Sequence, residues 1–237
     1  MLRFGVIAEG LTDQTVTENI LFGYFQGEEE PWVRYVQPPS PTPISPAPPG
    51  GWTLVFTSLR QGKAQEALQF NDYVVIQIDT DVQDEIGFDV PRSEGGNELS
   101  IDDRVRRVIE RLKKDIDSSF YEARKHQILF AITVDTIECW LLPFLYEDDK
   151  AAKTTGCFEP ANRALRKANV KALYVGDNAS RVYEAASSSF RKRKRLTECR
   201  DKNPSLELFV KQLDVLQIAR TVNSPPSSKE PDGDAAT

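Results

Sequence analysis

Histidine, methionine and cysteine are scarce in this chain of 237 residues, which has one histidine, one methionine and three cysteines. The cysteines, Cys139, Cys157 and Cys199, have no ligand-like spacing such as C-x-x-C, which argues against a zinc site. Scattered cysteines, odd in number, are typical of a cytosolic protein with reduced, packed thiols. We therefore expect free thiols and a cytoplasmic location. The single histidine, His126, is expected at the surface rather than as a catalytic base.

Long apolar runs and two familiar signals are also absent. No stretch approaches the roughly 20 apolar residues that a membrane helix needs, so no membrane partner is expected. The N-terminus lacks the basic start and long apolar run of a secretory signal. A phosphate-binding loop of the form G-x-x-x-x-G-K-[ST] is missing, which excludes an ATPase built on that loop.

Acidic residues exceed basic ones, and the two kinds are unevenly distributed. The net charge of −6 alone argues against a general nucleic-acid binder. Residues 1–150 carry 14 basic and 26 acidic residues, whereas residues 151–221 carry 15 basic and 7 acidic ones. Such asymmetry points to a phosphate-bearing partner, with an acidic metal site in one part and a basic phosphate-binding surface in the other. Simple drift of surface charge is the alternative.

Apolar segments and helical patterns alternate along the first 150 residues. Residues 4–8, 32–36, 72–78 and 127–134 read as strands, the third being almost continuously apolar and β-branched. Helical spacing follows Thr12, a good N-cap, and recurs at 52–59, at 64–70 and after Ser100. This order predicts an α/β fold with a mostly parallel four-stranded sheet flanked by helices.

Proline content, helical spacing and composition indicate how the rest of the protein is divided into domains. Seven prolines between Pro38 and Pro49 exclude regular hydrogen-bonded structure there. Beyond residue 150 no strand is expected, and residues 161–168 and 206–218 read as helices. We therefore predict a catalytic domain at 1–150, a basic helical extension at 151–222 and a disordered tail at 223–237.

Carboxylates follow three of the predicted strands. Glu9 comes after the first, Asp79 and Asp81 after the third, and Asp135 and Glu138 after the fourth. Ligands of open parallel sheets bind where the carboxyl ends of the strands meet, so we expect these side chains at one edge. Carboxylate oxygens suit Mg²⁺ or Mn²⁺, and a cation would offset their mutual repulsion. The dull alternatives are a turn residue for Asp135 and a helix cap for Glu138.

The order Glu-Gly, helix, strand and Asp-x-Asp resembles the TOPRIM domain of topoisomerases, primases and OLD-family nucleases. Glu9-Gly10 matches the first motif and Asp79-Thr80-Asp81 the second. The longer Glu-Gly-x-x-Asp form, which adds Asp13, is closer to the OLD type. Residues 137–142 resemble small bacterial TOPRIM-like proteins associated with defence against phage. The resemblance covers roughly residues 3–145 and implies a TOPRIM, Rossmann-like fold.

The resemblance also implies roles for particular residues. Glu9, Asp79 and Asp81 would hold the metal and carry catalysis, and Glu9 would either bind metal or move a proton. Asp13 and Glu138 are the candidates for a second metal, although Asp13 also suits the positive end of its helix. Lys202 is the candidate for the lysine that OLD-type enzymes place near the phosphate. A separate ATPase subunit is the partner that the family leads us to expect.

A run of five basic residues, Arg191-Lys192-Arg193-Lys194-Arg195, is expected to stay exposed because its charges repel one another. It is our candidate contact for nucleic-acid phosphates, and a merely solvated loop is the alternative.

Three functional hypotheses result. The first is a Mg²⁺- or Mn²⁺-dependent nuclease that acts on DNA or RNA in anti-phage defence, either alone or as a homo-oligomer. The second is a non-catalytic TOPRIM-like subunit that docks an ATPase or a toxin. The third is another phosphoryl-transfer enzyme using the same site. An intact set of mutually repelling acids favours the enzyme over the inert subunit.

Overall fold

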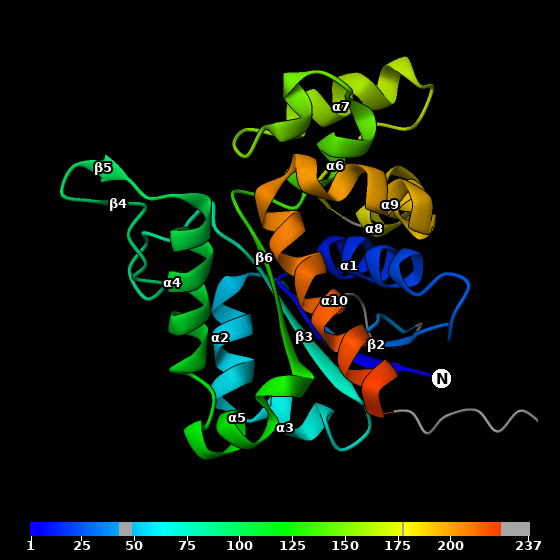
Figure 1. Ribbon diagram of the computed structural model, residues 1–237. Helices are drawn as coiled ribbons and strands as arrows, with labels where there is room; N and C mark the ends of the chain where they lie inside the picture. Colours follow the sequence, from blue (N-terminus) through cyan, green and yellow to red (C-terminus); the bar gives the residue numbers. More distant parts are fainter. Residues whose placement is uncertain (43–48, 177, 224–237) are drawn as a thin grey trace, which may run out of the picture.

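The computed structural model describes residues 1–42, 49–176 and 178–223, and omits the side chains of 218 and 221–223. Four strands form a parallel sheet in the order β2-β1-β3-β6: β1 (Arg3–Ile7), β2 (Trp32–Gln37), β3 (Tyr73–Asp79) and β6 (Ile128–Thr133). The expected α/β class and parallel four-stranded sheet are therefore confirmed. The architecture is consistent with a Rossmann-like fold (Figure 1).

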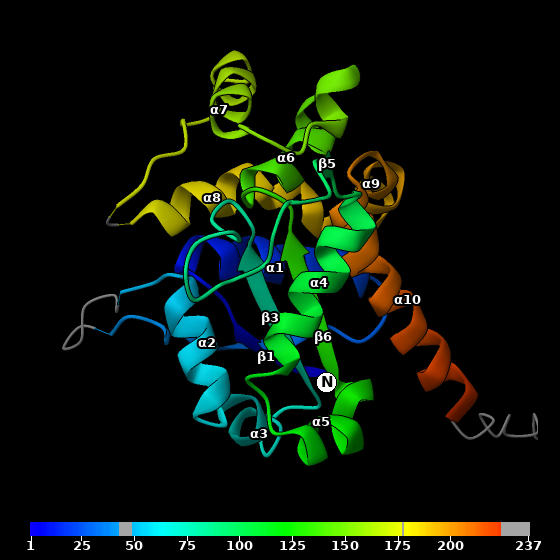
Figure 2. The same cartoon turned by 90° about the vertical axis from the view of Figure 1, so that its left-hand side faces the viewer.

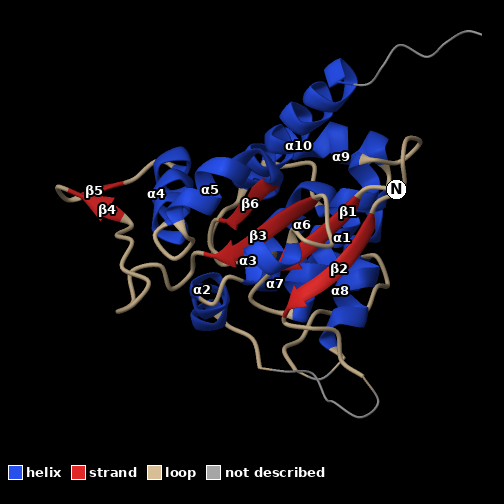
Figure 3. Ribbon diagram, turned by 90° about the horizontal axis from the view of Figure 1, so that it is seen from below, coloured by secondary structure: helices blue, strands red, loops and turns tan. Residues whose placement is uncertain are grey.

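Helices cover both faces of this sheet (Figures 1 and 3). The helices of the chain, in sequence order, are α1 (Leu11–Tyr24), α2 (Trp52–Arg60), α3 (Lys63–Ala67), α4 (Ile101–Lys113), α5 (Ser118–Arg124), α6 (Glu138–Leu145), α7 (Phe158–Lys167), α8 (Ala179–Ser187), α9 (Arg193–Cys199) and α10 (Pro204–Asn223). A small hairpin, β4 (Ser93–Glu94) with β5 (Asn97–Glu98), extends from the loop that precedes α4 (Figure 1) and projects toward the viewer in Figure 2.

Alternation along the strands sorts their side chains into two cores. In β3, Val75 packs with α1 and the C-terminal helices, whereas Val74, Ile76 and Ile78 pack with α2, α3 and α4. Successive side chains of a strand point to opposite faces, so a strand covered on both sides reads as a continuous apolar run. Gln77, fully buried within that run, is the exception. It lies on the α1 face and points toward the end of the strand that carries the candidate site.

The bounds of α2 and the start of α4 agree with the sequence, and Ser100 caps α4 by accepting the N–H of Asp103 at 3.1 Å. Helix α4 ends at Lys113, three residues before the predicted end at Ile116. The expected N-cap of α1 is wrong: the helix begins at Leu11 with Gly10 as its N-cap, and the Thr12 hydroxyl donates to Asp13 instead. Helices α5, α8 and α9 were not predicted, because short helices with few apolar positions give weak periodicity. The helix implied by the alternative role of Glu138 is α6, which begins at that residue. Residues 43–48 of the proline-rich segment and 224–237 of the predicted disordered tail lie outside the described residues.

The helical extension shares a core with the part of the chain that forms the sheet. One apolar cluster joins Val16 and Ile20 of α1, Trp140 of α6, and Phe190 and Phe209 of the extension. Helices α8 and α9 both contact α1 (Figure 1). The boundary placed at residue 150 therefore marks a change of composition, and the packing is continuous across it.

A close approach to Gly23 fixes the extension against α1. A β-carbon at Gly23 would stand 1.7 Å from the carbonyl oxygen of Phe190, so only glycine fits there. Gly23→Ala is expected to destabilise the protein by roughly 1–3 kcal/mol in urea unfolding, as overpacked substitutions do. In a helix without this contact, the same change would instead stabilise by about 1 kcal/mol. A rise in the free energy of unfolding would thus contradict the packing described.

None of the helices in the described residues is both long enough and apolar enough to cross a lipid bilayer.

Candidate metal centre

Three loops bring carboxylates to the carboxyl edge of the sheet. Glu9 follows β1, Asp79 ends β3, and Glu138 opens α6 just after β6. The backbone N–H of Asp79 donates to Glu9 Oε1 at 2.9 Å, so the first and second motifs of the sequence are in direct contact. The N–H of Ile137, next to Glu138, donates to Asp79 Oδ2 at 3.1 Å. Two hydrogen bonds therefore join all three loops through Asp79.

Asp13 completes the cluster from the first turn of α1. Its carboxyl accepts the Thr12 hydroxyl at 3.2 Å and lies against Gly10, where a β-carbon would be 2.9 Å from Oδ2. Asp13 and Glu138 are only 6% and 8% exposed. Two buried carboxylates beside Asp79 are costly unless something compensates them.

Burial and electrostatic repulsion raise the pKa values of the acids in the cluster. Burial, and then the charge of Asp13, raise the pKa of Glu9 to about 8. Burial and the charge of Glu138 raise the pKa of Asp13 to about 7. The pKa of Asp79 is raised as well, by burial and by the surrounding acids, Asp13 first. Each shift reflects a folded environment that penalises the charged carboxylate.

Ion pairs do not relieve this repulsion. Within the part of the chain that the structure describes, no lysine or arginine forms an ion pair with Glu9, Asp13, Asp79, Asp81 or Glu138. The donors that reach the acids are neutral: backbone N–H groups, the Thr12 hydroxyl, the Gln77 amide and the Tyr183 hydroxyl. Arg92 donates to the Asp81 carbonyl, and its charge partly offsets the rise in the pKa of Asp81. The buried acids Asp13, Asp79 and Glu138 have no such cation among the described residues.

A cleft of about 450 Å³ opens onto the buried acids. Asp13, Asp79 and Glu138 line it, together with Tyr174 and Tyr183 from the extension. Glu9 and Asp81 are not among its lining residues. Glu9 is half-buried and accepts the N–H of Asp79, and Asp81 is exposed on the loop that leaves β3, where its charge still adds to the repulsion on Glu9 and Asp79.

The donor set fits a hard divalent cation, although its oxygens are not drawn together into a coordination shell. Mg²⁺ and Mn²⁺ prefer carboxylate oxygens. In the described residues, one group of three potential metal ligands has ligand atoms within 4.8 Å of one another, and it consists of Asp135, Cys139 and Cys157. No three of the five acids therefore bring their carboxylate oxygens this close together. Side-chain rotation would have to accompany cation binding.

Polar residues that the sequence analysis did not single out position the acids. Gln77 donates to Asp79 Oδ1 at 2.8 Å and accepts the N–H of Glu9 at 3.3 Å. A polar residue inside an apolar strand was a visible signal for this role. Tyr183 of α8 donates to Glu138, a contact between residues 45 positions apart that no local pattern could reveal.

Thr80 and Asp135 lock the ends of β3 and β6 together. The Thr80 N–H donates to the Asp135 carbonyl at 2.9 Å, and the Thr80 hydroxyl accepts the Asp135 N–H at 3.0 Å. Arg104 of α4, only 2% exposed, donates to the same hydroxyl at 3.1 Å. The carboxylate of Asp135 does not line the acidic cleft; it accepts the N–H of Gly156 at 2.7 Å, and its charge helps to raise the pKa of Asp81, after burial. Asp135 therefore supports the edge of the sheet and lies outside the cluster.

Lys202 does not line the cleft. It ends a short 3₁₀ turn (Arg200–Lys202) just before α10 and is half-buried. The neighbouring Asn203 donates to the carbonyl of Cys139, which places this turn beside α6.

The basic run lies at the opposite end of α1 from Asp13. The Arg191 guanidinium stands 4.3 Å from the centre of the Phe22 ring, and Arg193 pairs with Glu28. At 1.5 Å per residue, the helix separates Asp13 from Phe22 by about 14 Å.

Part of the charge of the run is already neutralised. Lys194 and Arg195 both pair with Glu198, at 3.9 and 3.5 Å, in addition to the pair formed by Arg193. The expected exposure is confirmed for Arg191, Lys192, Arg193 and Lys194, whereas Arg195 is half-buried. The run forms a short turn and the start of α9, and this geometry puts Glu198 one turn away from its basic partners. Lys192 and the outer side of Arg191 remain the best-placed anion contacts.

The cysteines differ from the expectation of three reduced thiols. Cys139 and Cys157 form a disulfide across 18 residues of sequence, and only Cys199 is free. The reasoning from spacing failed because the fold brings two distant cysteines together. The argument for a cytoplasmic location that rested on free thiols loses its basis.

Comparisons of this chain with protein-family models, with curated proteins and with solved structures find no match.

Proposed function

We propose that this protein is a metal-dependent phosphodiesterase of the TOPRIM type that cleaves nucleic acid. One observation carries the proposal: Glu9 and Asp79, with Asp13 and Glu138 beside them, gather from separate loops into an acidic cluster that no ion pair in the described residues neutralises. A purely structural role gives no reason to keep several buried acids that repel one another.

Asp79, Asp81 and Glu9 would hold Mg²⁺ or Mn²⁺, and Asp13 and Glu138 would take part in a second binding position. When bound there, the cation stabilises negative charge on the phosphate oxygens and on the leaving or attacking oxygen. The chain itself positions the ligands, since Gln77 and the Ile137 N–H each hold one oxygen of Asp79. Glu9 Oε2 accepts no hydrogen bond from the described residues, so this atom is free to bind a cation or to accept a proton from water.

The basic run would hold the nucleic acid beside the cleft. Replacing Arg191–Arg195 with serine is expected to weaken DNA or RNA binding. It should also reduce the slope of log Kd against the logarithm of the salt concentration by about 2 to 4, because each lost phosphate contact changes that slope by about 0.9. Fluorescence anisotropy at several salt concentrations measures this slope. Arg106→Ser with Lys125→Ser is the matched control, because α4 and the end of α5 lie on the other side of the sheet. An unchanged slope in the serine variant would remove the run from the interface.

The proposed activity is tested with purified protein and four substrates: single-stranded DNA, duplex DNA, single-stranded RNA and a structured RNA. Each is incubated with Mg²⁺, with Mn²⁺ or with EDTA, and products are resolved on denaturing gels. Cleavage with either metal and none with EDTA is the expected result. If every substrate stays intact, the assay is repeated with the separate ATPase subunit that the TOPRIM resemblance leads us to expect. Inertness there too, in a protein that still binds the metal, would favour a non-catalytic subunit.

A further inference from the structure

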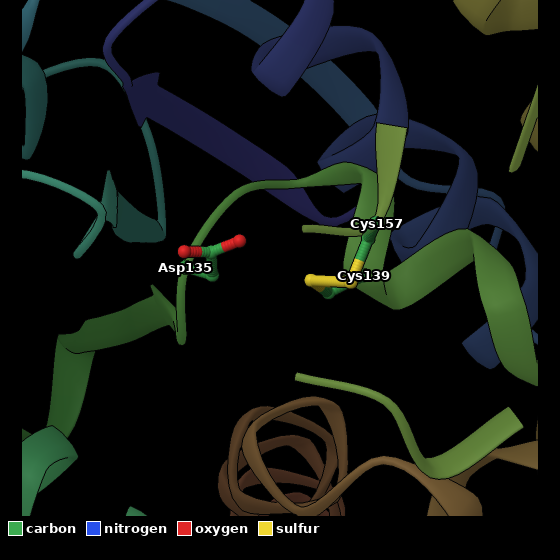
Figure 4. Close-up of side chains that lie close together, drawn as sticks. All are labelled: Asp135, Cys139 and Cys157. Atoms are coloured by element: carbon green, nitrogen blue, oxygen red, sulfur yellow. A yellow bond between two sulfur atoms is a disulfide. The ribbon is translucent and has the colours of Figure 1, made fainter. Parts of the chain in front are cut away.

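A second group of ligand atoms lies beside the acidic cleft and differs from it in chemistry. Cys139 is in the first turn of α6, Cys157 is the N-cap of α7, and Asp135 follows β6. The two sulfurs and one Asp135 oxygen all lie within 4.8 Å of one another, and no other group of three potential ligands in the described residues is this close (Figure 4). The Cα atoms of the two cysteines are 5.0 Å apart.

The surroundings hold these three residues in place. Both cysteines are essentially buried, at 0% and 1% exposure. The Asp135 backbone has a φ of 68°, a left-handed conformation that its two hydrogen bonds to Thr80 maintain. The Asp135 carboxylate accepts the N–H of Gly156, the residue before Cys157. Hydrogen bonds of this kind orient metal ligands and raise affinity, so the carboxylate is already supported as a ligand.

We propose that reduction of the Cys139–Cys157 disulfide converts this group into a site for one thiophilic divalent cation of the zinc class, with the two thiolates and the Asp135 carboxylate as ligands. The inference does not depend on the nuclease activity. Two thiolates and one carboxylate suit zinc, whose bonds to sulfur and oxygen are about 2.3 and 2.0–2.2 Å long, with water in the fourth position. Mg²⁺ avoids thiolate, so the two sites select different metals.

The redox step balances with an external dithiol. One thiolate of the dithiol attacks a sulfur of the disulfide, a mixed disulfide forms, and the second thiol of the reductant then releases the remaining cysteine. The reductant gives up two electrons and two protons as it closes to its own disulfide, and the protein gains two thiols. Zinc then displaces the two thiol protons as the Zn–S bonds form. Rotation of the two cysteine side chains makes room for the ion between the sulfurs.

The redox state of the cell compartment would determine whether the protein holds the disulfide or the metal-binding dithiol. A reducing compartment favours the dithiol and therefore the metal, whereas an oxidising one keeps the disulfide. Either form ties the start of α6, which carries Glu138, to the segment that leads into α7. The same cross-link position is thus held by a covalent bond in one case and by a cation in the other.

The test uses the full chain in two redox states. One sample is reduced anaerobically with a phosphine and desalted, and the other is left oxidised. Both are titrated with Co²⁺, a spectroscopic substitute for zinc, and the thiolate-to-cobalt charge-transfer band in the near ultraviolet is recorded. The reduced protein is expected to bind one equivalent and to show the band, which Zn²⁺ abolishes and excess Mg²⁺ leaves unchanged. The oxidised protein is expected to show no band.

Variants then assign the ligands. The double variant Cys139→Ser with Cys157→Ser should lose the band, and Asp135→Asn should weaken Co²⁺ binding by roughly 10- to 100-fold. Cys199→Ser is the control and should bind like the natural chain, because Cys199 is a buried free thiol outside the group. The proposal is overturned if the reduced natural chain shows no band, if the band persists in the double variant, or if the reduced chain unfolds and zinc does not restore its near-ultraviolet circular dichroism.

Discussion

Asp79→Asn is expected to lower the rate of metal-dependent cleavage by roughly 10²- to 10⁴-fold, the range seen when a charge-stabilising group is lost from a catalytic site. Asp79 touches both other loops of the site, since its N–H reaches Glu9 and its Oδ2 accepts the N–H of Ile137. No other acid in the cluster has this connection. Single-turnover rates at saturating Mn²⁺, together with calorimetric Mn²⁺ titration, measure the effect on chemistry and on binding separately.

The same substitution should leave the protein folded. Removing a buried charge from among like charges stabilises the fold, whereas an amide can accept only one of the two hydrogen bonds that Asp79 now receives, from Gln77 and from Ile137. The lost acceptor costs about 1–3 kcal/mol, so the two effects oppose each other. We expect a melting temperature close to that of the natural chain.

Glu85→Gln is the matched control for Asp79→Asn. Glu85 is exposed on the loop that follows Asp81, and only its backbone makes hydrogen bonds. This variant should cleave at the natural rate. Equal rates for Asp79→Asn and the natural chain, with full Mn²⁺ uptake by both, would refute the assignment of Asp79 as a metal ligand.

The metal-free protein should become less stable as the pH rises from about 5 to about 8. The folded-state pKa values of Glu9, about 8, and Asp13, about 7, lie above the ordinary values of 4.5 and 3.8. Well below pH 3.8 the two groups are protonated in both states. As the pH rises, the unfolded chain loses these protons first, and the folded state then binds more protons than the unfolded state does, so stability falls. A loss on the order of 2–5 kcal/mol across this window is expected.

Urea unfolding in EDTA at several pH values measures this loss. Glu9→Gln combined with Asp13→Asn should make the free energy of unfolding depend less on pH, because neither amide titrates. Mg²⁺ at about 100 times its Kd should raise the free energy of unfolding by roughly 2.7 kcal/mol at pH 8, since a ligand that binds only the folded state stabilises it. A pH-independent stability in EDTA would show that the acids are not held in the repulsive cluster described above.

The acidic cluster was predictable because it depends on chain order and sheet direction alone. Glu9 and Asp79 each follow a strongly apolar segment, and parallel strands place their carboxyl ends at one edge. The contact between Glu9 and the Asp79 N–H confirms that part of the prediction. The roles of the acids in catalysis and in metal binding remain predictions for the experiments above to decide.

Contacts across long stretches of sequence were not predictable. Tyr183 reaches Glu138 only because α8 packs on α1, and the Gly23 contact with Phe190 requires the same packing. Neither residue has a distinctive local pattern. Charge pairing within the basic run, through Glu28 and Glu198, likewise depends on where the turn and α9 begin.

The sequence by itself determined the parallel α/β sheet and the edge at which its acids gather, because strand periodicity is local and a helix between successive strands favours a parallel crossover. The tertiary structure alone decided the partners of Cys139, the closing of the cleft by the extension and the neutral hydrogen bonds that hold Asp79. These features join residues far apart in the chain, and their positions follow from how apolar faces pack together, which no single segment specifies.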